Sequence, residues 1–252
     1  MQKRRNNDKT SHEKKQLRGE VQQADVNYFK SQKYDLAWFN PVGRQKNITE
    51  ALDQYDWVIV QAPSGTGKTS TVIWKALNLL GHGYRKIIYV KNPTEAGDDM
   101  IGYLTGDADQ KLQAHFDSVR NTFMDFMSKG KLESDEKNGN IQFKIPNFLL
   151  GATLSDSIVI LDEAQVYSPN TLKLLMERVD DSCKLIIMGD ARQTYSVKKR
   201  PDGLTDLVDR VTIIDSVGRQ SNEPLLAYIE LSTSENQRGA ISKRVTELYA
   251  LN

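Results

Sequence analysis

One short stretch of the chain combines two glycines, a lysine and two threonines. It reads APSGTGKT over residues 62–69, with Ala62 where a glycine is usual, and it follows an apolar run at 57–60. Glycines let the backbone turn its N–H groups inward around a phosphate, and the start of a helix adds partial positive charge. Lys68 can reach the β- and γ-phosphates of a nucleotide, and the Thr69 hydroxyl can ligate Mg²⁺. The pattern predicts a phosphate-binding loop, and the alternative is a plain turn between a strand and a helix.

Two adjacent carboxylates end a second apolar run. The stretch IVILDEAQ at 158–165 places Asp162 and Glu163 directly after it. The carboxyl end of a strand is where an open α/β sheet presents its ligand site. Asp162 can hold Mg²⁺ through water, and Glu163 can orient and deprotonate a water for attack on the γ-phosphate. The alternative is a pair of solvated acids that lead into a helix.

A third apolar run ends in another polar cluster. The stretch IIMGDARQT at 186–194 would place Asp190 and Gln193 at the same edge of the sheet. A glutamine there can contact the γ-phosphate or the attacking water. Taken alone, this stretch is as consistent with a surface loop as with a functional site. The functional interpretation is favoured because this is the third predicted strand in a row that ends in residues of this kind.

These motifs require strands that end at one edge of a sheet, and the rest of the sequence predicts such a sheet. The predicted strands are 57–61, 86–91, 141–145, 157–162, 184–190 and 211–215. Four of these runs are almost unbroken Val, Ile and Leu, as in strands covered on both faces, whereas 141–145 alternates and suits an edge strand. The helices expected between them are 68–80, 109–128 and 169–179. The predicted fold class is α/β, with a doubly wound, mainly parallel sheet.

Other segments are predicted as loops or as peripheral helices. Residues 128–140 carry Gly, Ser and mixed charge, and residues 197–203 are basic, so both are expected to be exposed loops. Spaced apolar residues after about position 222 predict two packing helices. These residues are Leu225, Leu226 and Ile229, followed by Ile241, Val245 and Leu248. We expect a tail over 1–20 and a single domain over 21–252.

Charge and cysteine content limit the classes of function. The chain has 252 residues and a formal net charge of +1, so nucleic-acid binding would have to depend on local patches. Residues 1–18 hold seven Lys or Arg and two Asp or Glu, which predicts a disordered tail, with a nucleic-acid-contacting arm as the alternative. The one cysteine, Cys183, excludes an internal disulfide and is expected to be a core residue. With no apolar run near the ~20 residues of a membrane span, we expect a cytoplasmic protein.

The three motifs in this order resemble the ATPase core of superfamily 1 helicases. The closer resemblance is to the PhoH-like family, and further segments of the chain carry it. They are KNPTEAGDDMIGYLTGD at 91–107, LGATLSDSIVILDEAQ at 150–165, MERVDDSCKLIIMGDARQT at 176–194 and DGL at 202–204. Together they cover roughly residues 45 to 220. Some members of that family are encoded by bacteriophages, so the resemblance implies a phage or bacterial protein, in the host cytoplasm if phage-encoded.

The resemblance implies an ATP hydrolase with a single RecA-like core that uses ATP and Mg²⁺. Thr69 and Asp162 would be the metal ligands, Glu163 would activate water and Gln193 would sense the γ-phosphate. Gln45 resembles the glutamine that reads adenine in such ATPases, although a surface polar residue is the alternative. The candidate nucleotide-binding residues are Gln45, Ala62, Pro63, Ser64, Gly65, Thr66, Gly67, Lys68, Thr69, Ser70 and Asp190.

Several arginines usual in the family are replaced here. Asn92 stands for one of them, and Leu150 and Ala152 stand for two others. Near the C-terminus, DSVGRQ at 215–220 resembles a family segment with different neighbours around its arginine. These departures bear on nucleic-acid or subunit contacts rather than on ATP binding.

A single core also raises the question of where the catalytic arginine comes from. Charge on the transferred phosphoryl group is usually stabilised by an arginine. The candidates are Arg178 and Arg219, with a surface salt bridge as the alternative for each. Supply from a neighbouring subunit would require a head-to-tail homo-oligomer, which the family resemblance suggests is a hexameric ring.

Three functions are compatible with these residues. The first is an ATP-driven motor or remodeller on single-stranded RNA or DNA, for which Lys198, Lys199 and Arg200 offer positive charge. The second is a nucleotide-dependent assembly switch with slow hydrolysis and no strand separation. A small-molecule phosphotransferase is the third, and the lack of an arginine-rich lid segment disfavours it. A GTPase is disfavoured because no Asn-Lys-x-Asp motif occurs.

Overall fold

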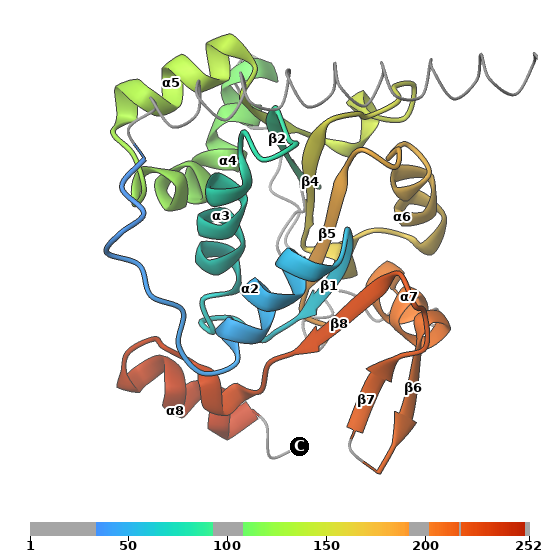
Figure 1. Ribbon diagram of the computed structural model, residues 1–252. Coiled ribbons are helices and arrows are strands. Elements are labelled where there is room, and N and C mark those ends of the chain that lie inside the picture. The colour runs from blue at the N-terminus through green and yellow to red at the C-terminus, as the bar shows by residue number, and fades with distance from the viewer. Residues whose placement is uncertain (1–33, 93–107, 192–201, 217, 250–252) are drawn as a thin grey trace, which may run out of the picture.

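Six strands form one sheet in which every pair of neighbouring strands runs parallel. The computed structural model describes residues 34–92, 108–191, 202–216 and 218–249. In the order of the sheet, the strands are β3 (Ile141–Lys144), β2 (Lys86–Lys91), β4 (Ser157–Asp162), β5 (Lys184–Gly189), β1 (Trp57–Gln61) and β8 (Leu226–Glu230). The predicted α/β class with a mainly parallel sheet is confirmed (Figure 1).

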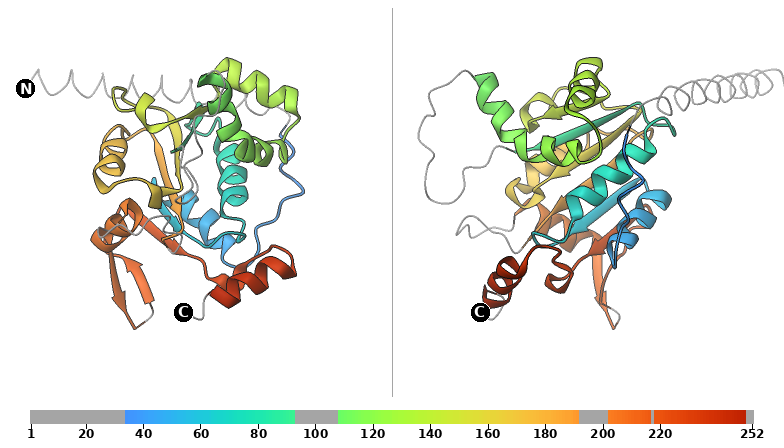
Figure 2. Two further views of the ribbon diagram at one scale, coloured as in Figure 1. Left: turned by 180° about the vertical axis from the view of Figure 1, so that it is seen from behind. Right: turned by 90° about the vertical axis from the view of Figure 1, so that its left-hand side faces the viewer.

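Helices cover both faces of this sheet, as Figures 1 and 2 show. One face carries α2 (Gln45–Gln54), α3 (Lys68–Leu79), α4 (Ala108–Met124) and α5 (Lys129–Asn138). The other carries α6 (Pro169–Met176) and α7 (Gly203–Val211). Burial on both faces explains why the central strands are continuous apolar runs, because neither side of them can face water.

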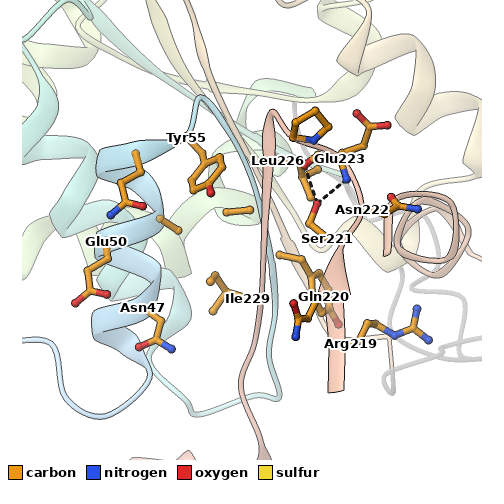
Figure 3. A pocket seen from close by; sticks show the side chains of 15 residues that line it. Asn47, Glu50, Tyr55, Arg219, Gln220, Ser221, Asn222, Glu223, Leu226 and Ile229 are labelled. Carbon is orange, nitrogen blue, oxygen red and sulfur yellow. Dashed lines mark hydrogen bonds between the residues drawn. The ribbon is translucent and has the colours of Figure 1, made fainter. Parts of the chain in front are cut away.

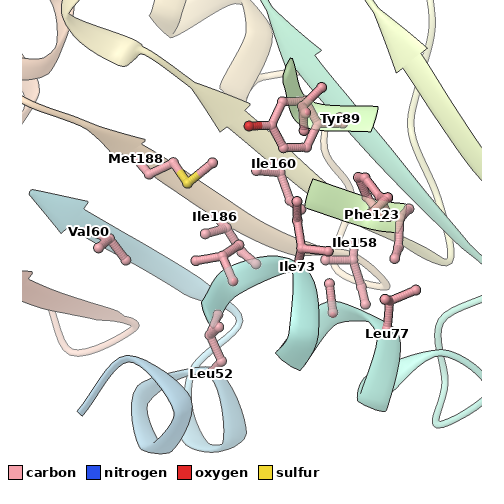
Figure 4. Packing of buried hydrophobic residues seen from close by; sticks show 14 of the residues in the cluster. Leu52, Val60, Ile73, Leu77, Tyr89, Phe123, Ile158, Ile160, Ile186 and Met188 are labelled. Carbon is pink, nitrogen blue, oxygen red and sulfur yellow. The ribbon is translucent and has the colours of Figure 1, made fainter. Parts of the chain in front are cut away.

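Apolar side chains of α3 pack against the sheet and hold the helix in place. Ile158, Ile160 and Ile186 of the sheet pack against Ile73 and Leu77 of α3 (Figure 4), and all five are at most 3% exposed. Replacing one of these large side chains by alanine would cost about 2–5 kcal/mol of stability. The packing therefore holds α3, and the loop before it, rigidly over the carboxyl edge of the sheet.

The strand register brings the three predicted motifs to one edge. Lys91 at the end of β2 lies opposite Asp162 at the end of β4, and Gln61 at the end of β1 lies opposite Gly189. Since all strands are parallel, their carboxyl ends share that edge, as the sequence predicted.

One predicted strand lies outside the main sheet. The run 211–215 forms β6 (Thr212–Asp215), which pairs with β7 (Gly218–Ser221) in an antiparallel two-stranded hairpin. This hairpin projects from the body of the molecule in Figures 1 and 2, and Ile213 and Ile214 are exposed. The prediction of a sixth buried parallel strand here was wrong, because apolar composition alone does not identify the strand's partner.

The sixth strand of the sheet is instead β8, in a segment predicted to be helical. Leu226 and Ala227 are buried and the strand pairs with β1 from Trp57 to Gln61. A five-residue apolar run satisfies both helical and extended patterns, so only pairing with β1 decides its structure. The second predicted C-terminal helix is present as α8 (Ala240–Tyr249), but Ile241, Val245 and Leu248 are exposed rather than packed.

The segment predicted as a loop at 128–140 is mostly the helix α5. The Ser128 side chain accepts a hydrogen bond from the Lys131 backbone N–H, and Gly139 ends the helix in the left-handed conformation. Leu132 and Asp135 are buried beneath it. The caps at both ends and one buried apolar residue are enough to form this helix. The prediction of a loop relied on the lack of apolar periodicity and therefore missed it.

Three short 3₁₀ turns complete the described chain. They are η1 (Pro146–Phe148), η2 (Ala164–Val166) and η3 (Thr233–Glu235). Three predicted features lie outside the described residues. They are the tail over 1–20, residues 197–201 of the predicted basic loop, and Gln193. No helix within the described ranges has the length and apolarity that crossing a membrane requires.

Candidate nucleotide-binding site

The glycine-rich loop connects β1 to α3, and two of its glycines have backbone angles that other residues rarely adopt. Gly65 has φ of 83° and Gly67 has φ of 77°. A Cβ at Gly67 would lie 2.5 Å from the Gln45 side chain, and one at Gly65 would lie 2.5 Å from that of Asn236. Both positions therefore favour glycine for its conformation, and a Cβ at either would have to displace the end of a hydrogen-bonded side chain. Gly67 is the N-cap of α3, so the backbone N–H groups at the start of that helix face the loop.

This loop borders a cavity of about 380 Å³ at the carboxyl edge of the sheet. The loop and α3 contribute Ser64, Gly65, Gly67, Lys68, Thr69 and Ser70. The cavity is also lined by Tyr89 and Lys91 of β2 and by Asp162 and Glu163 at the end of β4. Helix α4 contributes Ser118, Val119 and Thr122, and the C-terminal segment contributes Gln237 and Arg238. Lys68 and both predicted carboxylates thus line one cavity, which is large enough for a bound triphosphate.

Asp162 is held in place by two hydrogen bonds. Its Oδ1 accepts from the backbone N–H of Glu163 at 2.9 Å, and its Oδ2 accepts from the hydroxyl of Tyr89 at 2.5 Å. Burial raises the pKa of Asp162, and the charge of Glu163 adds to the rise. The Tyr89 hydrogen bond and the charges of Lys68 and Lys91 act in the opposite direction. The carboxylate is therefore oriented by its neighbours before any ligand arrives.

Glu163 follows in a left-handed backbone conformation with φ of 52°. Its Oε2 accepts a hydrogen bond from the side-chain Nε2 of Gln165 at 2.7 Å, and the side-chain Oε1 of Gln165 accepts from the backbone N–H of Asp190 at 3.1 Å. Gln165 is 6% exposed, so this bridge is buried. The amide of Gln165 therefore connects the second predicted motif to the third.

Gln45 lies beneath the phosphate loop. Its Nε2 donates to the carbonyl of Thr66 at 2.8 Å, and its Oε1 accepts from the backbone N–H of Val42 at 3.0 Å. The residue is 6% exposed, so the surface-polar alternative is wrong. These contacts support the conformation of the loop, and adenine recognition by Gln45 stays a prediction.

Several other predicted binding residues shape the loop from within. Ala62 is fully buried, and its N–H donates to the carbonyl of Gly189 at 2.9 Å. The Thr66 hydroxyl donates to the Pro63 carbonyl at 2.9 Å. Asp190 is 4% exposed at the end of β5. Ala62, Pro63 and Thr66 therefore stabilise the phosphate loop, whereas Ser64 and Ser70 line the cavity itself.

Neither arginine singled out from the sequence lines this cavity. Arg178 follows α6, and its guanidinium donates to the carbonyl of Leu174 within that helix. Arg219 pairs with Asp209 at 3.0 Å and borders a separate cavity of about 630 Å³ between α2 and β8 (Figure 3). Within this core, neither position is suited to a phosphate contact.

The cavity holds two positive side chains that the sequence did not reveal. Lys91 lies at the end of β2, and Arg238 lies just before α8. The backbone N–H of Gln237 donates to the carbonyl of Gly65 at 2.7 Å, which places this C-terminal segment directly against the phosphate loop. Lys91 could have been found as a polar residue that ends a buried strand. Arg238 carries no comparable local signal, because a chain reversal after β8 brings it there.

The side chains present suit a magnesium ion bound together with a nucleotide. Among the described residues, no group of three or more His, Cys, Asp or Glu side chains could hold a metal ion by itself. Mg²⁺ at phosphate sites usually takes one or two protein ligands, with waters and phosphate oxygens for the rest. Thr69 and the buried Asp162 line the same cavity and meet that requirement.

The fold and the site define a P-loop NTPase. The defining features are the parallel sheet, the glycine-rich loop before α3, and the strand-end Asp162, which lines the same cavity as Lys68. The model of the PhoH-like protein family matches residues 41–250. The chain belongs to this family.

The curated relatives are distant in sequence. A PhoH-like protein of Bacillus subtilis is 29% identical over 206 residues, which are 81% of this chain and 61% of that protein. A PhoH-like protein of Synechocystis is 28% identical, over 82% of this chain and 60% of its own length. Protein PhoH of Escherichia coli K12 is 25% identical, over 82% and 56%. The match therefore spans less than two thirds of each of these relatives.

Solved structures show more remote similarity. The large terminase ATPase domain of a Thermus phage has a TM-score of 0.49 and 12% identity, over 85% of this chain and 88% of that chain. The helicase domain of Hef from Pyrococcus furiosus has a TM-score of 0.45 and 12% identity, over 79% and 40%.

Proposed function

We propose that this protein hydrolyses ATP with the help of Mg²⁺ at the cavity beside the phosphate loop. The proposal depends on one observation, the convergence of Lys68, Asp162 and Glu163 on a single cavity at the carboxyl edge of the sheet. In this scheme Lys68 and the N–H groups of the loop bind the phosphates. Thr69 and Asp162 would hold the metal, which neutralises charge on the β- and γ-phosphates when bound.

Glu163 is the residue that activates water in this proposal. Its carboxylate lines the cavity and is oriented by the amide of Gln165 at 2.7 Å. A carboxylate held in this way can accept the proton of a water that attacks the γ-phosphate. Gln193, the predicted γ-phosphate sensor, follows Asp190 in the chain and stays a prediction.

We propose that Arg238 and Lys91 supply the positive charge that stabilises the negative charge developing on the phosphoryl group during its transfer. Both line the cavity from the same core that carries Lys68. Arginines in this role contribute about 10³–10⁵ in rate. With this source in cis, the catalytic arginine does not have to come from a second subunit. If Arg178 or Arg219 were the catalytic arginine, it would have to act on the nucleotide of a second subunit.

The matched variants Glu163→Gln and Lys68→Ala test the proposal. We expect Glu163→Gln to bind ATP as tightly as wild type but to hydrolyse it at least about 100-fold more slowly, because general base catalysis is lost. Lys68→Ala should weaken ATP binding itself. Equilibrium binding of a fluorescent ATP analogue and phosphate release measure the two effects separately. Normal turnover by Glu163→Gln would show that another group activates the water.

Coupling of hydrolysis to single-stranded RNA or DNA is the wider proposal. It is supported by membership of the PhoH-like family and by the positive residues Lys198, Lys199 and Arg200, which lie outside the described residues. The alternative is a nucleotide-dependent assembly switch with slow hydrolysis. Strong stimulation of phosphate release by single-stranded RNA or DNA supports remodelling, and a low rate that no polymer changes supports the switch.

A further inference from the structure

The hydroxyl of Tyr89 meets the carboxylate of Asp162 inside the nucleotide cavity. The register of the sheet explains the contact, because Tyr89 lies opposite Ile160 on the neighbouring strand, two residues before Asp162. Tyr89 and Asp162 therefore extend on the same face of the sheet, and the long phenol side chain reaches the strand end. Its hydroxyl donates to Oδ2 at 2.5 Å.

The ring of Tyr89 has no freedom to move away from this contact. It is fully buried. Phe123 from α4 packs edge-on at a centroid distance of 6.3 Å, and Phe143 from β3 packs at 6.3 Å in a tilted arrangement. The packing therefore holds the Tyr89 hydroxyl in a fixed place, where it donates to Asp162.

The two hydrogen bonds together determine how Asp162 can meet a cation. A carboxylate has about four lone-pair positions on its two oxygens. One position on Oδ1 is used by the Glu163 N–H and one on Oδ2 by the Tyr89 hydroxyl. The remaining positions are held in one orientation toward the cavity that both residues line.

We propose that Tyr89 is a positioning residue for Mg²⁺, which fixes Asp162 in the orientation that accepts hydrogen bonds from the water shell of the ion. This inference rests on the proposed ATP–Mg²⁺ function of the cavity. Without the hydroxyl, the carboxylate can rotate and must be ordered when the metal binds. The free energy needed to order the carboxylate then lowers the affinity for Mg²⁺, whereas the affinity for the nucleotide without metal is unchanged.

Tyr89→Phe tests the inference, with Tyr84→Phe as its control. Tyr84 makes a tyrosine–aspartate hydrogen bond of the same kind, to Asp56 at 3.0 Å, but it does not line the nucleotide cavity. Binding of a fluorescent ATP analogue is measured in EDTA and then across a Mg²⁺ titration. We expect Tyr89→Phe to need about tenfold more Mg²⁺ for half of the metal effect, with unchanged binding in EDTA. Tyr84→Phe should titrate as wild type.

A double variant separates positioning from general loss of structure. Tyr89→Phe should add nothing to the Mg²⁺ response of Asp162→Asn, because both changes act through the same carboxylate. Additive effects, or a wild-type Mg²⁺ midpoint in Tyr89→Phe, would overturn the inference while leaving the ATPase proposal intact. A wild-type protein that binds the analogue without any response to Mg²⁺ would overturn both.

Discussion

Three positive side chains and two carboxylates line the same small cavity. Lys68, Lys91 and Arg238 come from a helix start, a strand end and a C-terminal reversal. Asp162 and Glu163 are neighbours at the end of β4. Opposite charges at such short range limit the net charge of the empty site, and a triphosphate adds the negative charge that the surplus of cations accommodates. At the scale of single residues, the cavity lining makes Arg238 the arginine that we propose for catalysis.

Arg238→Ala is expected to lower kcat by about 10³-fold with a small change in nucleotide affinity, because an arginine of this kind acts mainly on the transition state. Phosphate release and equilibrium binding are the measurements. Arg219→Ala is the matched control, since Arg219 is a partly exposed arginine that pairs with Asp209 away from the loop. The reverse result, an active Arg238→Ala and an inactive Arg219→Ala, would favour an arginine supplied by a neighbouring subunit.

At the scale of elements, buried polar contacts hold α5 in place where the sequence suggested a loop. Asp135 is 1% exposed and accepts from the Tyr34 hydroxyl at 3.0 Å and from the Asn140 amide at 3.0 Å. Lys131 adds an ion pair from the preceding turn of the helix. These bonds connect α5 to the segment before α2 and to the start of β3. A helix with one buried apolar residue is thereby fastened to the sheet.

Asp135→Ala is expected to destabilise the protein by about 3 kcal/mol, because it leaves buried donors and the Lys131 charge without an acceptor. Glu133→Ala on the same helix is the control. Its carboxylate lies 3.9 Å from Lys129 in an exposed pair, so the loss should stay below about 0.5 kcal/mol. Urea denaturation measures both. Equal effects would mean that α5 is not fastened through Asp135.

At the scale of the whole molecule, several of the exposed apolar side chains of the described surface lie on the hairpin β6–β7 and on α8. Ile213 and Ile214 are 53% and 72% exposed on the hairpin, and Ile241 of α8 is 84% exposed. A two-stranded hairpin is marginally stable alone in water. Exposed apolar surface of this kind is typical of protein–protein contacts, which accords with the predicted homo-oligomer.

We expect the native protein to be a homo-oligomer, with a hexameric ring as the state suggested by family resemblance. Light scattering after size exclusion, with and without ATP, measures its mass. Ile214→Ser should shift the mass toward the monomer, because it removes apolar surface from the hairpin, and Phe148→Ser, which alters another exposed apolar residue, should not. A wild-type monomer at every ATP concentration would contradict the oligomer, and full ATPase activity in that monomer would favour the arginine in cis.

The agreement between sequence and structure is best where the signal is local. The bounds of β1, β2 and β4 are those predicted, and β3 and β5 each end one residue earlier. Cys183 is buried and its pKa is raised by that burial, as expected of a core cysteine. The errors concern β8, the hairpin and α5, whose structure depends on partners distant in the chain.

The sequence by itself determined the phosphate loop, the strand-end carboxylates and the parallel sheet that brings them to one edge. Spacing within a few residues carries that information, because a glycine turn, a helix start and a buried strand are local structures. Only the tertiary structure decided that Arg238 reaches the loop, that Tyr89 holds Asp162 and that Gln45 supports the loop from below. Those contacts join segments 21 to 173 residues apart, and chain reversals and register, rather than local pattern, bring such segments together.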